Sequence, residues 1–151
     1  MKSHAMRRIL SSMRKPSFVL LAILTIAVIC SAAHPASGQP AAGEQLLGTW
    51  SGTWDGAGSG GGFELTFERE KEGPVTGKVS VTGEPTYKAA LKTLSFDGKK
   101  MTATYDFTPD DAAEVILAAS FDRNTASGTW SLREKSTGNE VASGSWKVTR
   151  K

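Results

Sequence analysis

Beyond position 38 the sequence contains neither cysteine nor histidine. The only cysteine is Cys30, and the only histidines are His4 and His34. Histidine-dependent catalytic triads, thiol nucleophiles and the usual zinc, copper and haem sites all need these residue types. We therefore expect a protein that is not an enzyme and that holds no metal or cofactor. With no cysteine pair there is no disulfide, so the fold must depend on an apolar core and a hydrogen-bonded backbone.

The first 38 residues have the composition of a helical signal peptide. An apolar run of 16 residues, 18–33, is shorter than the roughly 20 residues of a membrane-spanning helix. Basic residues precede it: Arg7, Arg8, Arg14 and Lys15. We expect an exported protein, periplasmic or extracellular, that contacts the membrane only through this leader.

Small residues around the end of the apolar run place signal-peptide cleavage near position 33 or 38. Translation starts at Met1 or at Met13, since either leaves a complete leader. The alternatives are an uncleaved anchor and lipoprotein processing at Cys30.

Removal of the leader reverses the net charge. Five of the 18 basic residues and none of the 15 acidic residues lie in positions 1–38, so the formal charge changes from +3 to −2. Contacts with nucleic-acid phosphates need a clustered basic face. We therefore expect no nucleic-acid partner.

From Leu46 onward apolar and polar side chains alternate, and turn-forming residues interrupt the alternation about every ten residues. Residues 39–45 are predicted to be a flexible tether and 46–151 to be one domain. The predicted strands lie within 46–54, 63–68, 75–82, 87–96, 101–107, 115–121, 128–133 and 144–149.

Two segments are less regular than the others. In 87–96 the apolar residues change face after Leu91, and a β-bulge near Lys92 reconciles the two halves. In 109–119 a capping-box pattern with an early proline permits a helix, whereas the alternation that follows favours a strand.

Every predicted connection is short, and short connections join only antiparallel neighbours. The predicted fold is therefore all-β, an eight-stranded antiparallel up-and-down meander. Closing this sheet into a small barrel buries its apolar face and removes its exposed edges.

Each of the four tryptophans follows a glycine by two positions. The pairs are Gly48 and Trp50, Gly52 and Trp54, Gly128 and Trp130, and Gly144 and Trp146. This spacing places both members on one face of a strand, where glycine leaves room for a large neighbouring ring. From the sequence, Trp130→Ala is predicted to cost about 3–5 kcal/mol as a large core truncation.

The segment Gly48-Thr49-Trp50 resembles the Gly-x-Trp motif in the first strand of calycins, the barrel group that includes lipocalins and avidin-like proteins. The resemblance covers 46–151 in topology and implies a calycin-like barrel with the Trp50 ring plugging one end. It also implies an arginine from late in the barrel that packs across this ring, a role that Arg150 fits. The chain lacks a second lipocalin motif and the biotin contacts of avidins.

The predicted binding site is the barrel interior. An eight-stranded barrel is just wide enough to be filled by side chains or to hold one small ligand. We expect a small apolar ligand, with Arg150 as its only charged contact. The predicted site residues are Trp50, Trp54, Phe67, Tyr105, Trp130, Trp146 and Arg150. The alternative is a filled barrel that acts through its surface on an envelope protein, as an inhibitor of an exported hydrolase or as a structural module.

Two further patterns are not interpreted as sites. The glycine-rich segment 55–62 formally matches a dinucleotide-binding fingerprint, but a strand follows in place of the required helix N-terminus, so a flap at the barrel mouth is predicted. Four acidic residues around the predicted turn at 108–112 match no calcium-binding loop and are expected to be solvated. They are Asp106, Asp110, Asp111 and Glu114.

Overall fold

The structure, a computed structural model, describes residues 43–56 and 58–151. Within these ranges one 3₁₀ turn, η1 (Glu44–Leu46), precedes nine strands. The strands are β1 (Gly48–Gly56), β2 (Ser59–Arg69), β3 (Val75–Val81), β4 (Tyr87–Ala90), β5 (Thr93–Phe96), β6 (Lys100–Asp106), β7 (Ala113–Asp122), β8 (Thr125–Glu134) and β9 (Glu140–Arg150). The predicted signal peptide, 1–38, lies outside the described residues. No helix in the described part of the chain is long and apolar enough to span a membrane.

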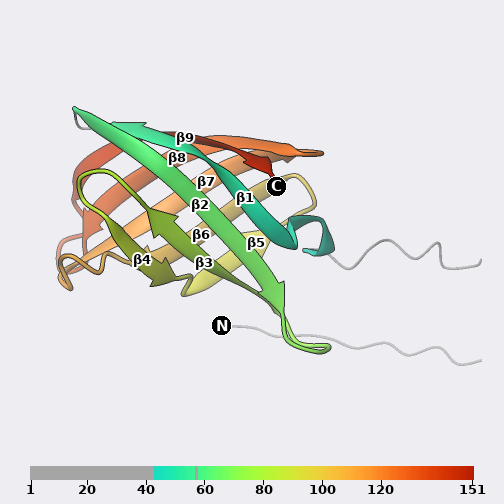
Figure 1. Ribbon diagram of the computed structural model, residues 1–151. Coiled ribbons are helices and arrows are strands. Elements are labelled where there is room, and N and C mark those ends of the chain that lie inside the picture. The colour runs from blue at the N-terminus through green and yellow to red at the C-terminus, as the bar shows by residue number, and fades with distance from the viewer. Residues whose placement is uncertain (1–42, 57) are drawn as a thin grey trace, which may run out of the picture. The chain divides into compact units, whose positions relative to one another are not determined.

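The strands form one antiparallel sheet in the order β4-β3-β2-β1-β9-β8-β7-β6-β5. Consecutive strands are neighbours except β4 and β5, which lie at the two edges of the sheet. In addition, β1 pairs with β9, which joins the start of the domain to its end. The sheet curls round a common interior, as Figure 1 shows. The predicted all-β, antiparallel up-and-down barrel is therefore confirmed.

The number of strands differs from the predicted eight, because 87–96 divides into β4 and β5. β4 pairs with β3, whereas β5 pairs with β6. Between them, the Leu91 N–H donates to the Gly77 carbonyl at 2.8 Å and the Lys92 N–H to the Thr104 carbonyl at 2.7 Å. The segment thus passes from one edge of the curled sheet to the other and links the two edges. The break falls where the apolar residues change face, at the predicted bulge.

The structure also resolves the predictions for three other segments. Residues 109–119 contain no helix, because a turn leads directly into β7. In the glycine-rich segment 55–62, where a flap was predicted, β1 and β2 stay paired as far as Gly56 and Ser59, so the described residues form a hairpin. The predicted tether and first strand meet in η1, which includes the fully buried Leu46.

The inward faces of the strands supply the core, as the alternation predicts. Phe121 lies at the centre of one aromatic cluster, within 4.9–6.4 Å of three other rings between centroids. These rings belong to Trp50, Phe67 and Phe96.

This end of the barrel, where β1 begins, is closed around Trp50. The Trp50 side chain is fully buried, and its indole N–H donates to the Leu46 carbonyl at 2.8 Å. The Arg150 guanidinium lies 4.4 Å from the centroid of the Trp50 ring. Arg150 also donates to the carbonyl of Leu47 at 2.7 Å and to that of Gln45. The predicted packing of Arg150 across Trp50 is therefore present, and it ties η1 to the last strand.

Candidate functional site

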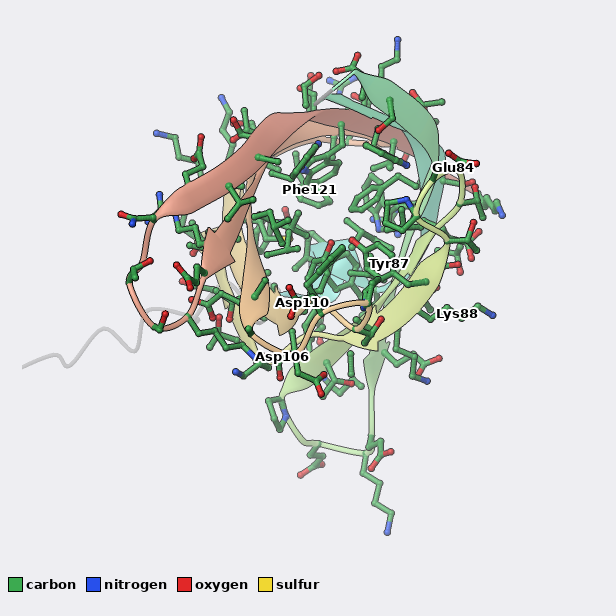
Figure 2. The ribbon with its side chains drawn as sticks, turned by 90° about the vertical axis from the view of Figure 1, so that its left-hand side faces the viewer. Glu84, Tyr87, Lys88, Asp106, Asp110 and Phe121 are labelled. Carbon is green, nitrogen blue, oxygen red and sulfur yellow. The ribbon has the colours of Figure 1, made fainter. Side chains whose placement is uncertain are left out.

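A cavity of about 150 Å³ lies at the other end of the barrel, where β1 ends. Figure 2 looks toward this end; Tyr87 points into the ring of strands and the adjacent Lys88 points away from it. No charged side chain lines the cavity. Its lining residues are Trp54, Ser59, Phe63, Val81, Pro85, Tyr87, Tyr105, Phe107, Val115, Trp130, Leu132 and Ala142.

Two tryptophans form one wall of the cavity. The rings of Trp54 and Trp130 meet edge to face, with centroids 5.8 Å apart and an interplanar angle of 79°. The Trp54 indole N–H donates to the Thr82 carbonyl, and that of Trp130 donates to the Asp55 carbonyl, both at 3.0 Å. Since both N–H groups are satisfied by backbone, the rings offer the cavity their apolar surfaces.

The tyrosines Tyr87 and Tyr105 supply the polar groups of the opposite wall. Their hydroxyl oxygens are 3.0 Å apart, and Tyr105 is only 1% exposed. Burial raises the pKa of both phenols, and the neighbouring Tyr87 raises that of Tyr105 further. Both hydroxyls therefore stay protonated at ordinary pH and keep their capacity to donate.

We expect these phenols to ionise only when the barrel unfolds. The chain has two tyrosines, so tyrosinate absorbance in the near ultraviolet reports this pair alone. The folded pKa is raised, so the folded state resists ionisation that the unfolded chain undergoes near the ordinary pKa of 10.0. Stability should therefore fall as the pH rises above this value. Tyrosinate absorbance and loss of the far-ultraviolet circular dichroism should coincide in an alkaline titration.

The double variant Tyr87→Phe/Tyr105→Phe is the control for this titration. It removes both ionisable groups, so it should retain more of its stability at the same alkaline pH. Tyrosinate absorbance near the ordinary pKa in a wild-type protein with unchanged circular dichroism would place a hydroxyl in solvent and contradict the prediction.

The acidic residues singled out from the sequence lie outside the cavity. Asp106 forms ion pairs with Lys135 at 2.8 Å and Lys92 at 3.0 Å, and hydrogen bonds from these two lysines lower its pKa. Asp110 accepts the Ala112 N–H at 3.0 Å and so stabilises the turn before β7. Among the described residues, no group of three or more histidine, cysteine or acidic side chains is placed to hold a metal ion.

The predicted site residues divide between the two ends of the barrel. Trp54, Tyr105 and Trp130 line the cavity. The other four lie elsewhere, Trp50 and Arg150 at the closed end, Phe67 against Phe121, and Trp146 against Phe63. The expectation that Arg150 would be a charged contact inside the site is therefore wrong, because Arg150 is held at the closed end by η1.

Nine of the twelve lining residues are not among the predicted site residues, and Tyr87 is the one of them that brings a hydroxyl to the pair with Tyr105. It comes from the irregular segment 87–96, whose change of face made the direction of individual side chains uncertain. The alternation of Tyr87 with Ala89 and Leu91 was the available signal, and all three are partly buried against the core.

Two wider hollows lie on the outside of the barrel. Their volumes are about 410 and 500 Å³, and polar or charged side chains make up most of each lining. One lies over β2, β3 and β4, and the other lies beside the Trp50–Arg150 contact. Neither is lined by aromatic and aliphatic side chains to the extent that the interior cavity is.

Comparisons with known proteins support the architecture. A solved structure described as a redesigned beta barrel is similar to this chain, with a TM-score of 0.55 and 15% sequence identity, over 73% of this chain and 95% of that one. The domain is a small β-barrel. At this identity the likeness concerns the fold alone. No protein family and no curated protein matches the chain.

Proposed function

We propose that this protein is an exported, non-catalytic binding protein that holds one small apolar molecule inside a calycin-like barrel. The observation that carries the proposal is the aromatic cavity of about 150 Å³. Transfer of apolar surface from water into such a site is favourable, at about 25 cal/mol per Å².

The size of the cavity limits the ligand. Drug-sized molecules occupy sites of roughly 300–1,000 Å³, whereas an apolar cavity of about 150 Å³ in another protein binds benzene. The ligand that fits is therefore a compact molecule of one or two rings. Fatty acids, retinoids and haem are too large for it.

Features outside the cavity support the rest of the proposal. Gly48-Thr49-Trp50 at the start of β1, with Arg150 across the tryptophan ring, is the arrangement that a calycin-like barrel implies. The leader-like composition of 1–38 supports export, and the charge of −2 without it argues against nucleic-acid binding.

The alternative, a filled barrel that acts through its surface, has less support. A filled barrel would bring its inward rings into contact across the whole interior, whereas here the rings near the end of β1 surround a void. The cavity is therefore the feature that favours an internal ligand.

The four indole N–H groups give a direct test by nuclear magnetic resonance. Titration with small aromatic compounds such as toluene and indole should shift the Trp54 and Trp130 indole signals, because both rings line the cavity. The Trp50 signal should stay in place, because this ring lies at the closed end. Single Trp→Phe variants assign the signals.

A matched pair of variants controls for surface binding. Ala142→Phe places a ring in the cavity lining and should abolish the shifts. Ser143→Phe adds the same ring at the next residue, which is exposed, and should leave them unchanged. Equal shifts of all four indoles, or equal binding by both variants, would contradict an internal site.

A further inference from the structure

The cavity contains one hydrogen-bond donor that its own residues leave free. The hydrogen bond between the Tyr87 and Tyr105 hydroxyls uses one of their two hydrogens. Whichever residue donates, the hydrogen of the other hydroxyl remains available. Among the described residues, no further hydrogen-bond partner of these two hydroxyls is present.

The other side-chain donors around the cavity are already used. The N–H groups of Trp54 and Trp130 donate to backbone carbonyls. The Ser59 hydroxyl donates to the Gly56 carbonyl at 3.4 Å. The tyrosine pair is therefore the one place in the lining where a side chain offers an unused hydrogen.

A buried donor without an acceptor is costly, and under-satisfied acceptors are tolerated better than orphan donors. A ligand that supplies an acceptor at this point relieves the cost, whereas a pure hydrocarbon of the same shape does not.

The lining also limits the ligand's charge. A charged group inside the cavity would meet no side chain of opposite charge, since none lines it. Burial of an unpaired charge is strongly unfavourable. The raised pKa of both phenols removes the tyrosines as a source of negative charge.

We propose that the ligand is an uncharged aromatic molecule with a single hydrogen-bond acceptor, such as a carbonyl or ether oxygen, which accepts the free hydroxyl hydrogen of the Tyr87–Tyr105 pair. The aromatic ring packs edge to face or offset against Trp54, Trp130 and Phe107, which is the arrangement that aromatic rings prefer. This inference rests on the proposed function and names the ligand class of the same cavity.

The test compares acetophenone with α-methylstyrene, which have the same shape but carry a carbonyl oxygen and a methylene group respectively. Dissociation constants are measured from the Trp54 and Trp130 indole signals in the wild-type protein and in Tyr87→Phe/Tyr105→Phe. The preference for acetophenone over α-methylstyrene should fall about three- to tenfold in the double variant, the value of one hydrogen bond. The ratio of the two dissociation constants in the wild-type protein is compared with the same ratio in the double variant. The difference in hydrophobicity between the two compounds contributes equally to both ratios and therefore cancels.

The single variant Tyr87→Phe separates the hydroxyl contact from a general change in packing. It leaves the Tyr105 hydrogen with no partner among the described residues, so the preference for acetophenone should be kept or increased. An unchanged Trp50 signal confirms the fold in each variant.

Each other outcome overturns a defined statement. Binding of both compounds with the same preference in wild type and double variant would overturn this inference and leave the proposed function standing. If neither compound shifts the Trp54 or Trp130 signal, the proposed function itself is overturned. Tighter binding of benzyltrimethylammonium or benzoate than of acetophenone would show that the cavity selects a charged ligand and would overturn the inference.

Discussion

Trp50→Ala is expected to lower the free energy of unfolding by about 3–5 kcal/mol, the usual cost of a large aromatic truncation in a core. The ring is 0% exposed, and it meets Phe121 edge to face at 4.9 Å. The variant also loses the hydrogen bond to the Leu46 carbonyl and the surface on which Arg150 packs. Since a small domain has only about 5–15 kcal/mol of net stability, this variant should be close to unfolding.

Trp130→Ala is the matched comparison for Trp50→Ala in urea denaturation. The sequence predicts the full core cost for Trp130, but this ring is only partly buried because one side of it faces the cavity. Its loss should therefore cost less than that of Trp50, and it should enlarge the cavity. Equal losses from the two truncations would show that Trp50 is not the anchor of the closed end.

Gly144→Ala is expected to cost about 3 kcal/mol, at the upper end of the usual range for overpacking. A Cβ at this position would lie 2.0 Å from the Asp55 carbonyl oxygen and 2.7 Å from the Trp130 indole nitrogen. The first contact is with β1, where Gly144 pairs with Gly56, and the second is with β8, where Gly144 pairs with Trp130. Relief of the clash requires the backbones to separate, so thermal unfolding should occur at a clearly lower temperature.

Gly73→Ala is the control for this substitution. Its Cβ would come no closer than 3.0 Å to another atom, the Glu70 carbonyl oxygen, in an exposed turn. Its effect on the melting temperature should be small. If Gly144→Ala has the same melting temperature as Gly73→Ala, the strands around Gly144 adjust to the added methyl group more easily than these distances indicate.

The glycine–tryptophan spacing predicted correctly how these residues are arranged in the sheet. It placed each pair on one face of a strand, and across β8 and β9 the pairs interlock, with Gly128 opposite Trp146 and Gly144 opposite Trp130. The spacing did not reveal the depth of each ring along the barrel. Trp50 and Trp54 share a face of β1, but one closes an end and the other lines the cavity.

Segment 87–96 shows why the strand count was harder to predict than the fold class. The change of face after Leu91 was visible in the sequence, and the bulge prediction located it. Its consequence, a strand that pairs with β3 in its first half and with β6 in its second, depends on how far the sheet curls. Local alternation carries no information on that curvature.

The sequence by itself determined which side chains face inward and that neighbouring strands run antiparallel. Side-chain direction in a strand alternates whatever the neighbouring strand is, and short connections permit no other arrangement. Only the tertiary structure decided that Tyr87 meets Tyr105 and that a void remains between the rings. These features depend on register and barrel closure, which bring together residues that are far apart in the chain.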